Sequence, residues 1–267
     1  MSKIGFIGTG NMGGALARAV GKSSHELYLS DFFKDKAEAL AKEIGKNAHA
    51  SDNPEIVAEC DMIFLGVKPQ MLPALATEIQ GGLAQRKTHI CLVSMAAGIT
   101  LARIGELFGQ TLPVIRIMPN TPAAVGAGMI LVCANEKASE TDKALLENAL
   151  AHAGTLDTIE EPLIDAASAL SGCGPAFVCL FAEALADGGV RCGLKRDQAL
   201  RYAIETLRGT AQLLCESGKH PGQLKDEVCS PAGSTIEGVT ALEEGGFRAL
   251  AIDAVTAAYE RTKELGK

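Results

Sequence analysis

Three glycines near the N-terminus have the spacing of a phosphate-binding turn. Gly8, Gly10 and Gly13 follow an apolar run and form the pattern Gly-x-Gly-x-x-Gly. The first glycine of such a pattern allows a tight turn, the second lets the backbone approach a pyrophosphate, and the third lets a helix pack closely on a strand. The N–H groups at the start of that helix attract an anion. We therefore predict a dinucleotide-binding turn, with a glycine-rich loop that binds nothing as the alternative. Its residues are Ile7, Gly8, Thr9, Gly10, Asn11 and Met12.

An acidic residue follows the next apolar run. Asp31 lies about 20 residues beyond the glycine pattern, where a carboxylate normally hydrogen-bonds the adenosine ribose of the cofactor. Its charge would repel a ribose 2′-phosphate and so favours NAD over NADP, although Lys34 and Lys36 follow closely and could offset that repulsion. A solvated Asp31 that caps the next helix is the alternative.

Two later apolar runs end in small or rigid residues that suit the same ligand. These residues are Val67, Lys68 and Pro69 after one run and Met95, Ala96 and Ala97 after the next. We expect the first group to pass the ribose and pyrophosphate, and the small alanines to admit the nicotinamide. Lys68 is a candidate general acid, while a solvated or anion-steering lysine is the more common role of a charge at a loop mouth.

Two turns in the C-terminal half precede helices and would offer backbone N–H groups to an anion. They comprise residues 171–175 and residues 230–236. The second turn also carries the hydroxyls of Ser234 and Thr235, so a small carboxylate could lie on the N–H groups while a hydroxyl reaches a neighbouring nitrogen or oxygen. An ordinary helix N-cap explains the same spacing equally well.

Short apolar runs alternate with helical patterns over the first 160 residues. This alternation is typical of βαβ units and of a mostly parallel, Rossmann-type sheet, which binds its ligand at the carboxyl ends of its strands. The predicted strands are 3–7, 26–30, 62–67, 89–94, 114–118 and 129–133. Two helix starts are well marked: Asn53 is the expected N-cap before Pro54, and Ser139 with Asp142 resembles a capping box.

After about residue 162 the strand patterns stop. Helices are predicted over 175–190, 195–215, 234–244 and 247–265, because apolar residues recur near i, i+3 and i+4. Their polar faces are too narrow for full solvation, so we expect a helical domain that packs against a partner subunit. The predicted fold class is α/β, with a dinucleotide-binding domain over 1–160 and an all-helical dimerisation domain over 161–267.

Composition excludes several other classes of function. The net charge of −7 argues against a nucleic-acid partner held through its phosphates. No segment has the order of a secretory signal and no run reaches ~18 apolar residues, so we expect a soluble cytoplasmic protein without a membrane partner. The eight cysteines lack metal-ligand spacing, and most are expected to be buried thiols. The five histidines are expected at the surface or at helix ends, and no metal is expected.

Taken together, these motifs resemble the pyrroline-5-carboxylate reductase family almost from end to end. The residues that carry the resemblance are Gly8-x-Gly10-x-Met12, Val67-Lys68-Pro69-Gln70, Arg116-x-Met118-Pro119-Asn120-Thr121-Pro122, Ser171-Gly172-x-Gly174-Pro175-Ala176-Phe177 and Leu224-Lys225-Asp226-x-Val228-x-Ser230-Pro231-x-Gly233-x-Thr235-Ile236. The last motif is highly specific, whereas many dehydrogenases share the first.

The resemblance implies a reaction and a set of site residues. Members reduce the cyclic imine of 1-pyrroline-5-carboxylate to L-proline with NAD(P)H, the last step of proline biosynthesis. They combine a Rossmann domain with a helical domain that forms a homodimer, often assembled into a decamer. By similarity, Gly233, Ser234 and Thr235 would hold the substrate carboxylate, and the catalytic Thr235 hydroxyl would contact the ring nitrogen. The residues that would border the cofactor by similarity are Asn53, Val67, Lys68, Pro69, Ala96 and Ala97.

Two departures from the family pattern and two rival functions stay open at this point. Many members have glycine at the position of Ala232, and some have serine at the position of Asp31, so both NADP and NAD remain candidates. A β-hydroxyacid dehydrogenase has a similar glycine fingerprint, but it carries a catalytic lysine on a helix that here, over 175–183, has none. A non-catalytic nucleotide-sensing protein is the other rival, and the intact loop 230–236 argues against it.

Overall fold

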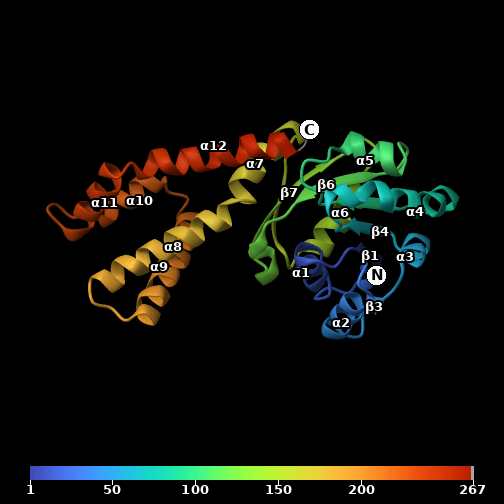
Figure 1. Ribbon diagram of the computed structural model, residues 1–267, viewed down its shortest axis with the longest axis horizontal. Helices are drawn as coiled ribbons and strands as arrows, with labels where there is room; N and C mark the ends of the chain where they lie inside the picture. Colours follow the sequence, from blue (N-terminus) through green and yellow to red (C-terminus); the bar gives the residue numbers. More distant parts are fainter. Residues whose placement is uncertain (266–267) are drawn as a thin grey trace. The chain divides into compact units, whose positions relative to one another are not determined.

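The computed structural model describes residues 1–265, which form two compact units (Figure 1). Unit 1 comprises Met1–Gly172 and the chain from Tyr259 onward, and unit 2 comprises Cys173–Ala258. Unit 1 combines a sheet with helices, whereas the described residues of unit 2 form helices alone. The predicted α/β class with a mostly parallel sheet and a helical C-terminal region is confirmed.

Unit 1 is built on an eight-stranded sheet in the order β3-β2-β1-β4-β5-β6-β7-β8. The strands are β1 (Lys3–Ile7), β2 (Glu26–Ser30), β3 (Ala48–Ala50), β4 (Met62–Leu65), β5 (Cys91–Ser94), β6 (Val114–Met118), β7 (Gly128–Ala134) and β8 (Gly154–Thr158). Neighbouring strands run parallel except β6 and β7, which are antiparallel. The predicted ranges for β1, β2 and β6 are confirmed. The edge strands β3 and β8 were not predicted, because both are largely exposed and lack an apolar run.

Helices cover both faces of this sheet. They are α1 (Asn11–Val20), α2 (Lys34–Ile44), α3 (Asn53–Glu59), α4 (Leu72–Gln85), α5 (Leu101–Phe108), α6 (Glu140–Leu150) and α7 (Ile164–Ser171), with 3-10 turns η1 (Pro69–Met71), η2 (Thr121–Val125) and η3 (Glu161–Leu163). One core packs α1, α2 and α6 against Phe6 and Phe64, whose rings stack at 4.5 Å. The other core joins α3, α4 and α5 through Ile56, Ile79 and Ile104.

The two marked helix starts have different outcomes. The capping box of Ser139 and Asp142 at the start of α6 is confirmed. The N-cap predicted at Asn53 is wrong, because Asp52 caps α3 by accepting a 2.9 Å hydrogen bond from the Glu55 N–H. The Asn53 side chain instead accepts a hydrogen bond from Ser30 and donates one to Glu78. It therefore connects the end of β2 to α4.

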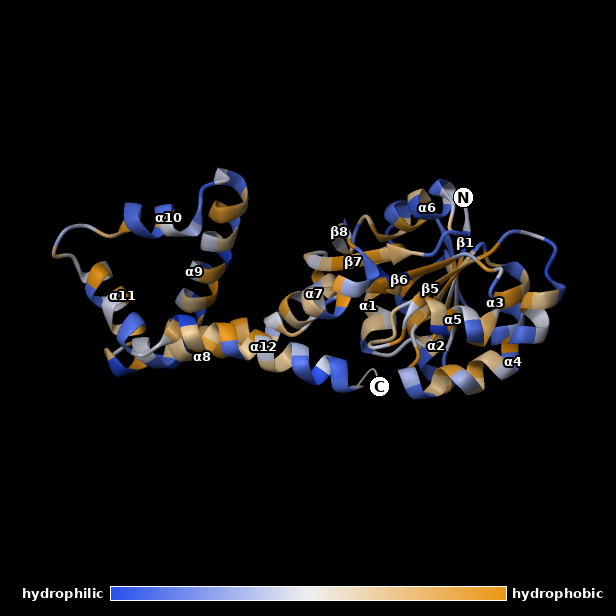
Figure 2. Ribbon diagram, turned by 90° about the horizontal axis from the view of Figure 1, so that it is seen from above, coloured by the Kyte–Doolittle hydropathy of each residue, from blue (hydrophilic) through white to orange (hydrophobic). Residues whose placement is uncertain are grey.

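Unit 2 consists of long helices with exposed apolar faces. Its helices are α8 (Gly174–Arg191), α9 (Arg196–Ser217), α10 (Pro221–Val228), α11 (Ser234–Glu244) and α12 (Phe247–Leu265), the last of which ends in unit 1. The predicted bounds of α11 and α12 are confirmed. Leu180, Leu250 and Ile252 expose about two thirds of their surface (68%, 65% and 65%). Figure 2 shows apolar stretches along α8 and α12, the two helices that carry these three exposed side chains.

By length and composition, one helical stretch of the described residues could cross a membrane. It runs from Glu161 to Arg191, and 11% of its most apolar window is buried. Length and composition alone do not show a membrane span, because a helix that packs against another protein surface can be equally long and apolar.

The cysteines and histidines only partly follow expectation. Burial keeps Cys60, Cys91 and Cys133 out of water and raises the pKa of Cys133 to about 11. The prediction that most cysteines are buried is wrong, because the remaining five are exposed or partly exposed on unit 2. The surface position expected for His25 is also wrong, since its ring is buried and bonds to Asn148. Over residues 1–265, no group of three or more His, Cys, Asp or Glu side chains is arranged to hold a metal ion.

Candidate active site

The strand order reverses beside β1, and two loops meet there. β1 pairs with β2 on one side and with β4 on the other, in a register that aligns Ile7 with both Ser30 and Leu65. The loops after these strands therefore leave the sheet at the same edge. Open α/β sheets bind ligands in the crevice at such a reversal.

The glycine turn after β1 has the shape that a pyrophosphate requires. Gly8 adopts a φ of +98°, and a Cβ there would lie 2.7 Å from the carbonyl carbon of Gly66 after β4. A Cβ on Gly13 would overlap the Gly8 carbonyl oxygen, so α1 packs closely against the turn. A Cβ on Gly10 would meet nothing within 4 Å. The space in front of the turn is therefore open, and no side chain caps the first N–H groups of α1. These features fit a bound dinucleotide phosphate.

Asp31 connects the end of β2 to this glycine turn. Its Oδ2 atom accepts hydrogen bonds from the Thr9 N–H at 2.8 Å and the Thr9 hydroxyl at 2.9 Å, and Oδ1 accepts one from the Phe33 N–H at 3.1 Å. Burial raises the pKa of Asp31, but these hydrogen bonds outweigh burial and hold the pKa below its usual value. Asp31 is not the N-cap of α2, because Phe33 holds that position; Asp31 lies two residues earlier, where its Oδ1 atom accepts the Phe33 N–H bond.

The predicted cofactor residues lie at or after the ends of five neighbouring strands, β3, β2, β1, β4 and β5, but their side chains differ in accessibility. Ile7 and Ala96 are buried in the core, so their side chains face other apolar residues. Gly10, Asn11, Lys68 and Ala97 are exposed. The intermediate group is Gly8, Met12, Asp31, Asn53, Val67, Pro69 and Met95. The structure thus brings these residues to one edge of the sheet, with Thr9 held by Asp31.

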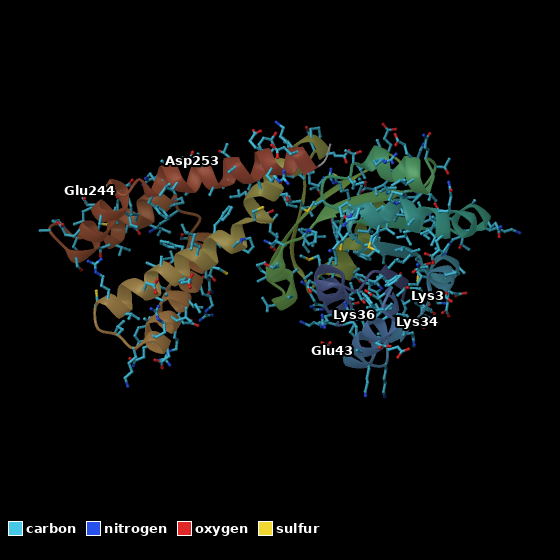
Figure 3. All side chains as sticks on the ribbon, viewed as in Figure 1. Lys3, Lys34, Lys36, Glu43, Glu244 and Asp253 are labelled. Atoms are coloured by element: carbon cyan, nitrogen blue, oxygen red, sulfur yellow. The ribbon has the colours of Figure 1, made fainter. Side chains whose placement is uncertain are left out.

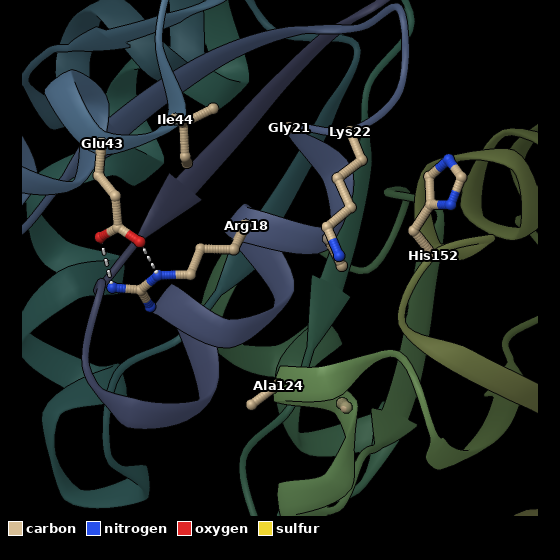
Figure 4. Close-up of a pocket in the computed structure, with 9 residues that line it drawn as sticks. Arg18, Gly21, Lys22, Glu43, Ile44, Ala124 and His152 are labelled. Carbon is tan, nitrogen blue, oxygen red and sulfur yellow. Dashed lines mark hydrogen bonds and ion pairs between the residues drawn. The ribbon is translucent and has the colours of Figure 1, made fainter.

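A separate hollow of about 320 Å³ lies at the opposite end of α1 (Figure 4). Arg18, Lys22, Glu43 and His152 contribute its charged or polar side chains, and Arg18 forms two hydrogen bonds of 2.7 and 2.8 Å with Glu43. None of the predicted site residues lines it. The hollow therefore lies apart from the glycine turn.

The second candidate centre lies in unit 2, at the start of α11. Gly233 is the N-cap in extended backbone, and no side chain caps the helix. The alternative of an ordinary N-cap within residues 230–236 is met by Gly233, but without a side-chain hydrogen bond to the helix. Ser234 and Thr235 occupy the first turn of α11 with exposed side chains that make no hydrogen bond. The first N–H groups of α11 and two hydroxyls are thus available at one helix end, which suits a small carboxylate.

The turn predicted over residues 171–175 is limited to Gly172 and Cys173, which separate the end of α7 from the start of α8. Gly172 and Cys173 have helical backbone angles, and the Gly172 N–H bonds to the Ser168 carbonyl at 2.7 Å. The chain therefore passes from α7 to α8 through two residues with helical backbone angles, and the anion seat expected here stays a prediction. The bond to the Ser168 carbonyl occupies the N–H group of Gly172, so this group is not available to an anion.

Two features of the site region were not predicted. The backbone of Gly66 lies against Gly8. In the sequence, the only sign of this contact was a glycine after an apolar run. Arg116 is 2% exposed and pairs with Glu161 at 3.3 Å and with Asp165 at 3.1 Å. A charged residue inside an apolar strand pattern was the available signal for the buried pair. These ion pairs attach η3 and α7 to the centre of β6.

Family models and named relatives together match nearly the whole of this chain. A family model described as pyrroline-5-carboxylate reductase dimerisation matches residues 161–265, and one described as NADP oxidoreductase, coenzyme F420-dependent, matches residues 3–98. Pyrroline-5-carboxylate reductase 3 of Danio rerio is 45% identical over 99% of this chain and 91% of its own length. Pyrroline-5-carboxylate reductase of Escherichia coli K12 is 40% identical over 99% and 98%.

Solved structures give the same result. Pyrroline-5-carboxylate reductase of Coxiella burnetii has a TM-score of 0.91 and 32% identity, covering 100% of this chain and 99% of its own. Pyrroline carboxylate reductase of Plasmodium falciparum, solved with NADP bound, has a TM-score of 0.87 and 32% identity, covering 100% and 98%. Prephenate dehydrogenase of Aquifex aeolicus, at 12% identity and a TM-score of 0.53, shares only the fold. The chain therefore belongs to the pyrroline-5-carboxylate reductase family.

Proposed function

We propose that this protein reduces the cyclic imine of 1-pyrroline-5-carboxylate to L-proline with NADPH or NADH as the hydride donor. The observation that carries the proposal is the uncapped start of α11, where Gly233, Ser234 and Thr235 present N–H groups and free hydroxyls. Full-length identity to named pyrroline-5-carboxylate reductases supports the same reaction. The reaction is the last step of proline biosynthesis.

Residues 1–160 would hold the dinucleotide. The open space before Gly10 and the uncapped N–H groups of α1 would receive the pyrophosphate, because they offer hydrogen-bond donors without steric obstruction. Asp31 would accept hydrogen bonds from the adenosine ribose. When bound, the reduced dinucleotide supplies a hydride from its nicotinamide ring to the imine carbon. The remaining proposed contacts are Ile7, Gly8, Thr9, Asn11, Met12, Asn53, Val67, Lys68, Pro69, Met95, Ala96 and Ala97.

Residues 161–267 would hold the imine. Its carboxylate would lie on the N–H groups at the start of α11, where the helix dipole favours negative charge. The Thr235 hydroxyl oxygen would accept a hydrogen bond from the protonated imine nitrogen, and the hydroxyl would donate to the neutral amine that forms. A protonated imine is already electrophilic at carbon, so the main task of these residues is to position it. Holding reactants in a productive geometry contributes up to about 7–11 kcal/mol in the best intramolecular cases.

We further propose a homodimer formed through the C-terminal helices, with assembly into a decamer, in the cytoplasm. The match to a dimerisation family over 161–265 and the exposed apolar faces of α8 and α12 support the subunit contact. The net charge of −7 supports the absence of a nucleic-acid partner. In this proposal the apolar stretch Glu161–Arg191 faces another subunit and not a membrane.

The decisive experiment measures imine-dependent consumption of the reduced cofactor by the purified oligomer, with proline identified by mass spectrometry. We expect both cofactor loss and proline formation with 1-pyrroline-5-carboxylate. Oxidation of a β-hydroxy acid in place of imine reduction would support the rival dehydrogenase. Tight dinucleotide binding without turnover on either substrate would support a sensing protein.

A further inference from the structure

A hollow of about 280 Å³ lies directly beside Asp31. It is formed where β2 and β3 end and where α2 and α3 begin. Its lining residues are Asp31, Lys34, Ala37, Glu38, Ala50, Ser51, Asp52 and Glu55. In a dinucleotide-binding fold the residue at the end of the second strand meets the adenosine ribose, so this hollow belongs to the adenosine end of the proposed cofactor site.

Carboxylates dominate the charge of the hollow. Asp31, Glu38, Asp52 and Glu55 are acidic, and Lys34 is the one cationic residue among the described residues that line it. Three of the four acids are fixed by hydrogen bonds. Asp31 accepts from Thr9, Asp52 accepts from the Glu55 N–H at 2.9 Å, and the Glu55 carboxylate accepts from the Ser51 hydroxyl at 2.6 Å.

Only one of the two nearby lysines lines the hollow. Lys34 and Lys36 both lie on α2 (Figure 3), but only Lys34 lines the hollow. The Lys36 ammonium lies 4.9 Å from the centre of the Phe33 ring. No arginine lines the hollow within the described part of the chain, and a guanidinium is the group that binds phosphate with two parallel hydrogen bonds.

We propose that this acidic hollow disfavours the ribose 2′-phosphate, so that the enzyme binds NADH more tightly than NADPH. The inference rests on the proposed function, because it assigns a preference within the same cofactor site. A ribose without a 2′-phosphate presents hydroxyl groups, which donate hydrogen bonds to carboxylates. A 2′-phosphate instead brings up to two negative charges close to the four acidic residues of the hollow. The Plasmodium falciparum relative solved with NADP is 32% identical to this chain, and its bound cofactor is a property of that protein.

Direct binding measurements test this preference without relying on turnover. The oligomer is titrated into NADH and into NADPH, and the fluorescence of the reduced nicotinamide reports the dissociation constant of each. The chain has no tryptophan, so energy transfer from tryptophan does not complicate the signal. We expect NADH to bind at least ten-fold more tightly at low ionic strength. Added salt should narrow the ratio, since it screens the repulsion.

A variant in which two lining acids are replaced by their neutral amides tests the role of their charge. The double variant Glu38→Gln/Glu55→Gln removes two negative charges while an amide oxygen remains to accept the Ser51 bond. We expect it to tighten NADPH binding several-fold, with a much smaller change for NADH. The control is Glu136→Gln/Glu147→Gln, which removes two charges from exposed positions of unit 1 outside the hollow. The control should leave the NADH to NADPH ratio within two-fold of the original.

The outcomes separate this preference from the proposed function. NADPH binding that equals or exceeds NADH binding overturns the preference and leaves imine reduction intact. An equal gain for NADPH in the control variant also overturns it, because net charge would then explain the effect. Binding of neither dinucleotide overturns both the preference and the proposed function.

Discussion

Thr9 donates two hydrogen bonds to a single carboxylate oxygen of Asp31, one from its backbone N–H and one from its hydroxyl, at 2.8 and 2.9 Å. Thr9 belongs to the glycine turn after β1, and Asp31 follows β2. The carboxylate therefore stabilises the turn that would receive the pyrophosphate and also lies where the ribose is expected. The shape of the turn and the charge at the adenosine end depend on one side chain.

Removing the Thr9 hydroxyl should weaken cofactor binding. Thr9→Val keeps the backbone donor but deletes the hydroxyl, and a hydrogen bond to a charged group is worth about 1.5–3 kcal/mol. We expect the dissociation constant for NADH to rise about ten-fold, which corresponds to about 1.4 kcal/mol. Fluorescence titration of the cofactor measures it. Thr9→Ser retains a hydroxyl and should bind nearly as the original, so equal weakening in both variants would contradict this role.

The start of α6 should lose stability in acid. Burial raises the pKa of Asp142, but hydrogen bonds from Ser139 and His89 outweigh burial and hold the pKa below its usual value. The folded pKa is therefore lower than the unfolded pKa. The contribution of Asp142 is complete above about pH 4 and is lost as the pH falls through the folded pKa.

Urea unfolding at several pH values measures this contribution. Asp142→Asn should lower the free energy of unfolding by about 1 kcal/mol near neutral pH, with a smaller difference at about pH 3. The neighbouring Glu140 is exposed and serves as the control, because Glu140→Gln should have little effect at either pH. A difference that does not shrink in acid would show that another group is responsible.

Arg116 should be important for the stability of unit 1. Its guanidinium is buried between Glu161 and Asp165, which are 27% and 32% exposed. Arg116→Met removes the charge and keeps an apolar stem, and breaking a buried pair costs about 3–5 kcal/mol. We expect the free energy of unfolding, measured with urea, to fall by about 3 kcal/mol. This value is at the lower end of the range because both acids are partly exposed to water. Arg103→Met breaks an exposed pair with Glu106 and should cost under about 0.5 kcal/mol.

Ala232 should be a site where glycine stabilises the protein. It adopts a φ of 58° in the loop before α11, which costs an L-residue about 1–2 kcal/mol. Ala232→Gly relieves that strain but adds about 0.4–1 kcal/mol of unfolded-state entropy. We expect the free energy of unfolding, measured by thermal unfolding, to rise by up to about 1 kcal/mol. Ala241→Gly, inside α11, should instead destabilise by about 1 kcal/mol.

Thr235 should affect turnover and leave cofactor binding unchanged. Thr235→Ala removes the hydroxyl proposed to contact the imine nitrogen, so kcat should fall about 100-fold, within the range for a positioned proton-transfer or hydrogen-bonding group. The NADH dissociation constant should stay within about two-fold, because α11 is separate from the glycine turn in the chain. Thr235→Ser should recover most of the rate. An unchanged kcat in Thr235→Ala would remove this residue from the reaction.

Local sequence patterns determined much of the fold and the location of the candidate site. The apolar runs of β1, β2 and β6 and the helical patterns of α11 and α12 predicted their bounds, because each pattern involves residues close together in the chain. The capping box of Ser139 and Asp142 was predicted for the same reason. The glycine spacing and the loop before α11 identified the expected cofactor turn and substrate turn.

Only the tertiary structure decided which distant residues meet. Gly8 touches Gly66, Asp31 binds Thr9, and Arg116 finds its two acids more than 40 residues away. The N-cap at Asp52 also depended on tertiary contacts, since Ser30 and Glu78 engage the neighbouring Asn53. Sequence spacing reports periodicity along one element, whereas these contacts depend on how separate strands and helices are brought together by the sheet.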